Sequence, residues 1–165
     1  MDIKEELKRS DKTSACVKFF CDKDGKYILC PYGRSPSKKW IGLAKLNYFI
    51  ISNYKAESKE ELLNNIYNCL NVSMNYDKLN IEKCMLKDDI LSKFVNKAKK
   101  EKYDGFSVIS IDLEIEDDYI EIVEWERVGK TGNEWRGNPK NFISISYNDF
   151  DIKVVDAIYK LIKCK

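Results

Sequence analysis

The stretch FSVISIDLEIEDDYIEIVEWERV, residues 106–128, has the pattern of two strands joined by a short acidic turn. In its first half Ile109, Ile111 and Leu113 recur at every second position, the period that places side chains on one face of a strand. Asp112 and Glu114 have the opposite parity. We therefore predict a half-buried β-hairpin whose outer face is acidic.

The second strand of this hairpin is less regular. Ile120 and Ile122 share one parity, whereas Val123 and Trp125 share the other. A β-bulge near Ile122 would turn both pairs toward one core. We therefore predict a bulge at that point.

More strand signals precede this hairpin. SACVKFF and KYILC flank a DKDGK turn, in which Asp24-Gly25 supplies the positive φ of a tight hairpin. A third apolar and aromatic run, LAKLNYFIIS at residues 43–52, predicts a further strand. The intervening PYGRSPSKKW, residues 31–40, contains Pro and Gly and predicts a loop.

Three segments have helical spacing. SKEELLNNIYNCL, residues 58–70, begins with Ser58 and has Glu61 three residues later, as in a capping box. KDDILSKFVNKAKKEKY, residues 87–103, has acids at its start, lysines at its end and one apolar stripe. After a predicted loop at 129–139 and a strand at 141–147, residues 148–165 predict a C-terminal helix capped by Asn148 or Asp149. Residues 71–87 have no clear period.

These elements predict an α+β fold: a largely antiparallel sheet with helices packed on it, formed by residues 1–165 as a single domain. Hydrophobic residues make up 44% of the chain and charged residues 34%, as in soluble globular proteins. No apolar run reaches the roughly 20 residues of a membrane helix. The charged start, MDIKEELKRS, lacks a signal-peptide core, so we expect a cytoplasmic protein.

Several kinds of chemistry are excluded or disfavoured. The chain has no histidine, which excludes Ser-His-Asp and Cys-His nucleophile systems. Its six cysteines form no C-x-x-C pair, so we expect most of them to be buried thiols, with no metal site or cofactor. Gly129-Lys130-Thr131 resembles the end of a phosphate-binding loop, but Glu124 occupies the place of the first glycine.

Charge is distributed unevenly along the chain. Residues 101–128 contain 10 acidic and 2 basic residues, although the whole chain has a formal net charge of +2. Repulsion among these acidic side chains lowers the stability of the fold, and a basic partner would compensate for it. We therefore predict a protein-binding surface with Trp125 as an aromatic anchor. Its acidic members are Asp112, Glu114, Glu116, Asp117, Asp118, Glu121 and Glu124.

Three other interpretations stay open. Asp112 and Glu114, with Glu124 and Glu126 on the neighbouring strand, could hold magnesium for a nuclease, although no Lys or Arg lies between Lys102 and Arg127 to assist. The acids could instead be a solvated sheet face. A nucleic-acid-binding protein could use the basic loop that contains Arg34, Lys38, Lys39 and Trp40.

The acidic hairpin, the closing ISISYNDFDIKVVDAIYKLI at residues 143–162 and the small histidine-free frame resemble immunity proteins of bacterial contact-dependent growth inhibition systems. The resemblance implies a cytoplasmic protein, not an enzyme, that binds one cognate toxin domain tightly and neutralises it. Such toxins are often nucleases that act on tRNA or DNA. The expected partner is therefore a basic nuclease domain, with no membrane and no direct nucleic-acid contact.

Overall fold

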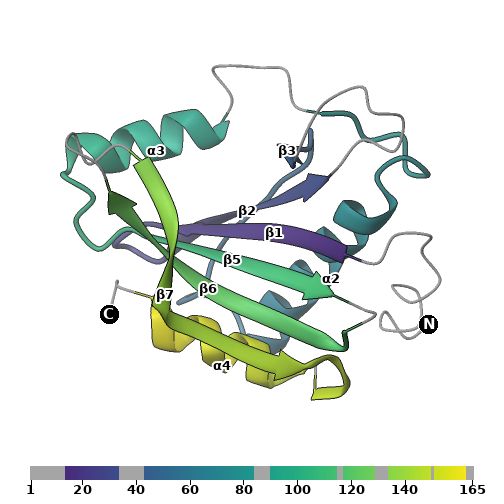
Figure 1. Cartoon of the computed structure of the whole chain (residues 1–165). Helices are drawn as coiled ribbons and strands as arrows, with labels where there is room; N and C mark the ends of the chain where they lie inside the picture. The colour runs from purple at the N-terminus through teal and green to yellow at the C-terminus, as the bar shows by residue number, and fades with distance from the viewer. Residues whose placement is uncertain are drawn as a thin grey trace.

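The computed structural model of the chain describes residues 14–33, 43–83, 90–114, 117–128, 134–149 and 151–162. Across these residues seven strands form one curled antiparallel sheet in the order β3-β2-β1-β5-β6-β7, and β4 also pairs with β2 (Figure 1). The elements are β1 (Ser14–Cys21), β2 (Lys26–Gly33), β3 (Ala44–Lys45), β4 (Ile50–Asn53), α2 (Lys59–Asn75), α3 (Ile90–Lys100), β5 (Ser107–Glu114), β6 (Tyr119–Val128), β7 (Glu134–Ser146), the 3-10 turn η1 (Tyr147–Asp149) and α4 (Ile152–Leu161). This is the α+β fold that the sequence predicts.

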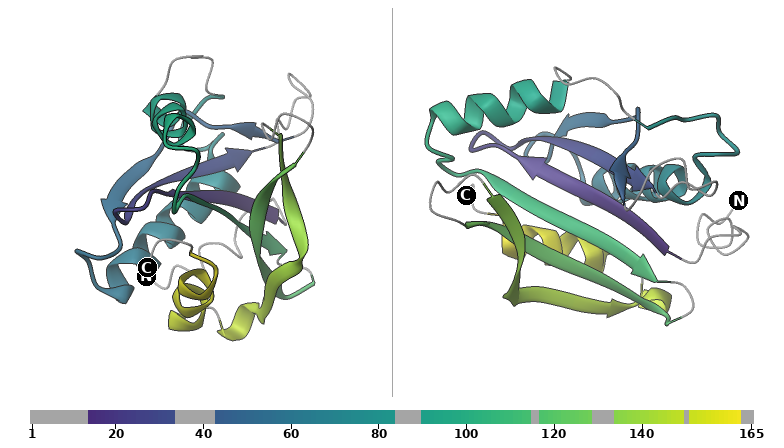
Figure 2. Two further views of the ribbon diagram at one scale, coloured as in Figure 1. Left: turned by 90° about the vertical axis from the view of Figure 1, so that its left-hand side faces the viewer. Right: turned by 45° about the horizontal axis from the view of Figure 1, so that its top comes forward.

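Helices cover both faces of the sheet (Figure 2). On the face that we call the α2/α4 face, α2 and α4 bury one core, which includes Val17, Phe19, Leu29, Ile109, Ile111, Ile122 and Ile158. On the opposite face, the α3 face, α3 buries a second core of Phe20, Ile28, Cys30, Leu91, Phe94, Ala98, Phe106 and Val108. The central strands β1 and β5 therefore carry apolar side chains on both faces of the sheet.

The first predicted hairpin is confirmed. β1 pairs with β2 from Cys16↔Tyr32 to Cys21↔Tyr27, and Gly25 in the turn has a φ of +89°. The Asp22 carboxylate accepts hydrogen bonds from the backbone N–H groups of Asp24 and Lys26, at 2.9 and 3.1 Å. The predicted third strand is divided, because β3 and β4 pair with different ends of β2.

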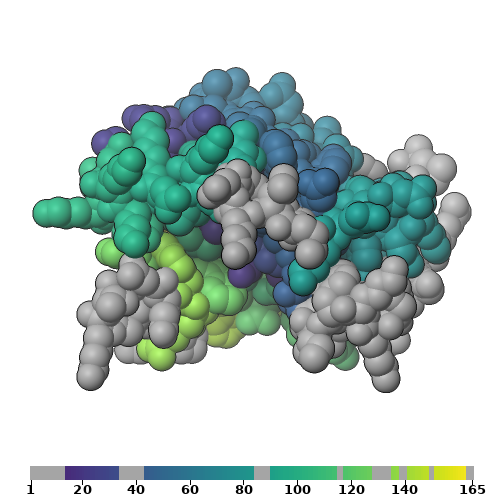
Figure 3. Space-filling model, turned by 90° about the horizontal axis from the view of Figure 1, so that it is seen from above, coloured from purple at the N-terminus to yellow at the C-terminus, as the bar shows by residue number. Residues whose placement is uncertain are grey.

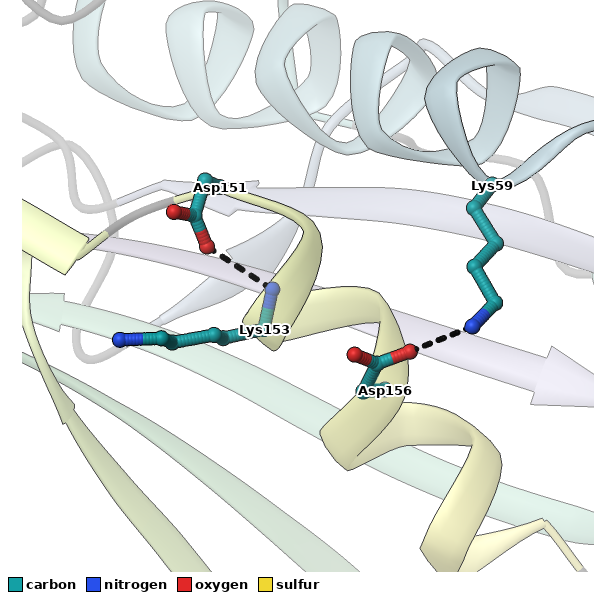
Figure 4. A network of polar contacts seen from close by, with 4 residues as sticks. All are labelled: Lys59, Asp151, Lys153 and Asp156. Carbon is teal, nitrogen blue, oxygen red and sulfur yellow. Dashed lines mark hydrogen bonds and ion pairs between the residues drawn. The ribbon is translucent and has the colours of Figure 1, made fainter.

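The predicted helices are confirmed with shifted ends. The Ser58 hydroxyl accepts a hydrogen bond from the backbone N–H of Glu61 at 3.1 Å, and α2 continues to Asn75, beyond the predicted end at residue 70. The predicted cap of the C-terminal helix is wrong, because residues 147–149 form the turn η1. Asp151 caps α4 instead and accepts from the Lys153 N–H at 2.9 Å (Figure 4).

β7 begins earlier than predicted and is irregular. Residues 134–139, predicted as loop, belong to this strand, and residues 129–133 lie outside the described part of the chain. Val123 pairs with Phe142 and Trp125 with Gly137, so residues 138–141 bulge opposite a single residue of β6. The prediction of a bulge in β6 near Ile122 is therefore wrong, and the irregularity lies in β7, opposite Glu124. It does not turn Val123 and Trp125 toward the α2/α4 face, because β6 stays in regular register with β5.

A buried serine joins α2 to the sheet. The Ser73 hydroxyl accepts a hydrogen bond from the Cys16 backbone N–H at 3.0 Å and donates one to the Tyr32 carbonyl at 2.5 Å. Near the other end of the sheet, Tyr27 of β2 donates to Glu57 and accepts from Asn65 of α2 at 3.0 Å. These contacts position α2 against β1 and β2.

The four described cysteines, Cys16, Cys21, Cys30 and Cys69, are buried free thiols, in agreement with the prediction that most of the cysteines are buried. Cys84 and Cys164 lie outside the described residues. Among the helices that the structure describes, none combines the length and apolar character needed to cross a membrane.

Candidate protein-binding surface

The β5–β6 hairpin divides the predicted acidic residues into separate groups. Asp112 pairs with Glu121 and Glu114 pairs with Tyr119, so these four side chains lie on the α3 face. Asp117 and Asp118 occupy the exposed turn between the strands. Glu116 lies outside the described residues.

Glu124 and Glu126 alternate with Glu121 along β6, so their side chains extend toward the opposite, α2/α4 face of the sheet. Glu124 pairs with Ile109, is only 8% exposed and accepts a hydrogen bond from the Asn141 side chain at 2.7 Å. Glu126 lies 3.8 Å from Arg136 of β7 in an ion pair. The structure therefore does not place either acid on the same face as Asp112 and Glu114.

This division also separates the four carboxylates of the magnesium hypothesis. Asp112 and Glu114 extend toward one face of the hairpin, and Glu124 and Glu126 toward the other. Within the described ranges, no three His, Cys, Asp or Glu side chains form a cluster that could hold a metal ion. The strand register of the hairpin therefore does not bring the four carboxylates together at one magnesium site.

The turn of the hairpin is anchored to the end of β7. Asp118 has a φ of 55°, and its carboxylate accepts hydrogen bonds from the side chains of Ser146 and Asn148, both at 3.3 Å. Its carbonyl accepts from the Tyr147 N–H at 3.0 Å. The acidic turn therefore has a defined position beside Ser146.

Negative charge converges on Tyr119. Partial burial raises the pKa of Tyr119 above its ordinary value, and four neighbouring carboxylates raise it further. Those carboxylates are Glu114, Glu121, Asp117 and Asp112. In the described part of the chain, no lysine or arginine forms an ion pair with Asp117 or Glu121.

Asp112 is the most enclosed member of this group. Burial raises the pKa of Asp112, while hydrogen bonds from Cys16 and Ser110 and the charge of Lys18 lower it in part. The Ser110 hydroxyl lies 3.1 Å from the Asp112 carboxylate. Because Glu121 lies directly opposite on β6, two like charges face each other across the pair, which destabilises a sheet.

Replacing Asp112 with asparagine should stabilise the chain at neutral pH. The folded chain binds the Asp112 proton more tightly than the unfolded chain, so the free energy of unfolding falls as pH rises through the raised pKa of the folded chain. The stability gain of Asp112→Asn should vanish below the ordinary aspartate pKa of 3.8. Denaturant unfolding of the wild type and of Asp112→Asn, from below pH 3.8 to neutral pH, measures this difference in stability. Asp117→Asn removes the same charge from an exposed position, and an equal gain there would contradict the explanation.

Trp125, the predicted anchor, packs within the molecule. It lies against the second core, and the Lys18 ammonium is 4.4 Å from the centroid of its ring system. Its ring nitrogen is buried, with no hydrogen-bond acceptor among the described residues. The Trp125 ring therefore contacts other parts of the molecule and is partly buried on the α3 face.

Phe142 is the aromatic side chain that sequence reasoning missed. It is 51% exposed and pairs with Val123, so it lies on the α3 face beside the strand that carries Glu121. The alternation in NFISISY contains the signal, because Ile143 and Ile145 pack against the first core and Phe142 has the opposite parity. We call this surface the acidic face; it consists of Asp112, Glu114, Asp117, Asp118, Tyr119, Glu121 and Phe142.

Comparisons with known proteins bear on the fold alone. No protein-family model matches the chain, and no curated protein matches it. A solved structure described as a protein of unknown function, NMB0488 from Neisseria meningitidis, is similar with a TM-score of 0.55 and 12% sequence identity, over 90% of this chain and 92% of that one. The two proteins are therefore similar in fold. In this chain that fold is α+β, with a curled antiparallel sheet and a C-terminal helix.

Proposed function

We propose that the chain is an immunity protein that binds a basic toxin domain through the acidic face and thereby neutralises it. One observation carries the proposal: carboxylates from two strands and their turn converge on Tyr119, and the exposed ring of Phe142 lies on the same face of the sheet, further along β7. A surface that combines one sign of charge with an aromatic side chain suits a protein partner of the opposite sign.

The energetics of the acidic face favour a basic partner. Asp112 opposes Glu121 directly, and neither Asp117 nor Glu121 has a cationic ion-pair partner among the described residues. Cations supplied by a partner would relieve this repulsion. The same field would also steer the partner toward the hairpin and raise the association rate.

A nuclease toxin fits this chemistry. Proteins that act on nucleic acid present lysines and arginines to phosphates, so an acidic face can occupy such a surface in place of the substrate. Inhibition of this kind requires no catalytic group, metal or cofactor of the inhibitor's own. Since toxin and nucleic acid would meet in the cytoplasm, the proposal also places the chain there.

Phe142→Ala should increase the rate at which the partner dissociates by roughly tenfold or more, because aromatic anchors near the middle of an interface carry a large share of binding energy. Phe49→Ala is the matched control, since Phe49 is 45% exposed at the opposite edge of the sheet. Surface plasmon resonance measures both rates. Equal dissociation rates for the two variants would show that Phe142 is not part of the interface.

The partner can be sought by affinity capture from the native host with the wild-type chain and with Asp117→Lys/Glu121→Lys. Glu82→Lys/Asp104→Lys makes the same change of charge at exposed positions outside the acidic face. We expect a basic protein to be retained by the wild type and by this control, and lost from the first variant.

Expression of that captured protein alone should arrest bacterial growth, and coexpression of the wild-type chain should restore it. Rescue by Asp117→Lys/Glu121→Lys should fail, whereas rescue by Glu82→Lys/Asp104→Lys should succeed. Capture that is the same for both variants would contradict binding through the acidic face. A captured protein without effect on growth would contradict the immunity role.

A further inference from the structure

Helix α3 presents a row of lysines to solvent. Leu91, Phe94 and Ala98 face the sheet and bury the second core. The exposed positions of the helix and of the turn that follows it include Lys93, Lys97, Lys99, Lys100 and Lys102. Figure 3 shows side chains of α3 protruding along one margin of this face, with part of β7 beside the helix.

Four acids of the described chain, Asp22, Asp24, Glu101 and Asp104, line one hollow with Lys97 and so lie beside this row. Glu101, the acid within it, forms an ion pair with Lys23 of the first hairpin turn at 3.3 Å. None of the five lysines has an ion-pair partner among the residues that the structure describes. Lys93, Lys97 and Lys100 recur at helical spacing, so they follow one line along the outer side of α3.

An arginine and a cluster of aromatic rings extend the row at the C-terminal end of α3. Tyr103 follows the helix in a left-handed conformation with a φ of 57°, and its N–H donates to the Ala98 carbonyl at 2.7 Å. The guanidinium of Arg127, from β6, lies 4.2 Å from the centroid of the Tyr103 ring. Trp135 of β7 packs edge-on against the same ring, with centroids 5.5 Å apart.

Arg127 is therefore a pre-positioned stacking group. Its side chain is exposed, and Tyr103 supports one side of it. Stacking on an arginine plane or an aromatic ring is the usual way in which proteins hold the bases of single strands. An acidic protein could pair with the lysines but would not require this platform.

We infer that α3 and Arg127 form a binding surface for single-stranded nucleic acid. The lysines neutralise successive phosphates along the helix, and a base stacks on the outer side of Arg127. This surface shares no residue with the acidic face, so the inference stands independently of the proposed function. It also differs from the basic loop at residues 34–40 suggested by the sequence, which lies outside the described residues.

The test measures binding of a fluorescent oligoadenosine RNA by anisotropy over a range of salt concentrations. The wild type should bind at low salt, and the logarithm of its association constant should fall linearly with the logarithm of salt concentration. Lys93→Gln/Lys97→Gln/Lys100→Gln should reduce that slope by about 2, since each single-strand phosphate contact contributes roughly 0.7. Lys55→Gln/Lys153→Gln/Lys160→Gln removes the same charge at exposed sites elsewhere and should leave the slope unchanged.

A second variant separates stacking from charge. Arg127→Lys keeps the charge but loses the planar group, so it should weaken RNA binding roughly tenfold. Polyglutamate serves as a probe for an acidic protein partner. Absence of RNA binding by the wild type, or equal losses in the two triple variants, would overturn the inference. Polyglutamate binding as tight as RNA binding and insensitive to Arg127→Lys would overturn it as well.

Discussion

Reversing the charge of Asp117 and Glu121 to lysine slows association with a basic partner by a factor of about 10 to 1,000 at low salt. Both side chains contribute to the negative field around Tyr119, and neither has an ion-pair partner in the described chain. Each substitution changes the local charge by two units. The measurement is the association rate from stopped-flow mixing at several ionic strengths, since the effect should shrink as salt screens the charges.

The specificity of this effect is tested with Glu82→Lys/Asp104→Lys, which alters net charge equally away from the acidic face. This control should change the association rate by much less. A similar slowing in both double variants would show that only the net charge of the chain matters. The acidic face would then have no particular part in the encounter.

Replacing Ser73 with alanine lowers the free energy of unfolding by about 1–3 kcal/mol. Ser73 is only 3% exposed, and its hydroxyl satisfies both the Cys16 N–H and the Tyr32 carbonyl. Alanine removes both hydrogen bonds and leaves two buried backbone groups without that partner. Urea denaturation followed by circular dichroism measures the difference in the free energy of unfolding between the wild type and Ser73→Ala.

Asn64→Ala is the matched control, because Asn64 lies on the exposed side of the same helix. Alanine has the higher helix propensity, so this control should be neutral or slightly stabilising. An equal loss of stability in both variants would assign the effect to α2 as a helix. The hydrogen bonds of Ser73 would then have no special weight.

Local chemistry was sufficient to predict the first hairpin and the start of α2. Gly25 adopts the positive φ that its turn requires, and Ser58 caps the helix without help from distant residues. The early part of β7 could not be predicted in this way. Gly137 and Pro139 are turn formers, but residues 134–137 pair with β6 and so belong to a strand, whereas Pro139 lies in the bulge that follows.

The acidic face was predicted only in part, because strand register and a second core are not visible in local sequence. Asp112, Glu114 and Glu121 fall on one face as their parity predicts. Glu124 does not, since the register places it opposite Ile109, where Asn141 from the bulge of β7 contacts it. Trp125 was predicted as an anchor for a partner, but it packs against the second core, which α3 covers.

Carboxyl footprinting of the chain with its captured partner tests the central claim most directly. Carbodiimide coupling of an amine to exposed carboxylates, followed by mass spectrometry, reports which acids the partner covers. Binding through the acidic face predicts that Asp117 and Glu121 react in the free chain and become protected in the complex, while Glu82 and Asp104 react equally in both. Protection of Glu82 or Asp104 with Asp117 and Glu121 still reactive would contradict it.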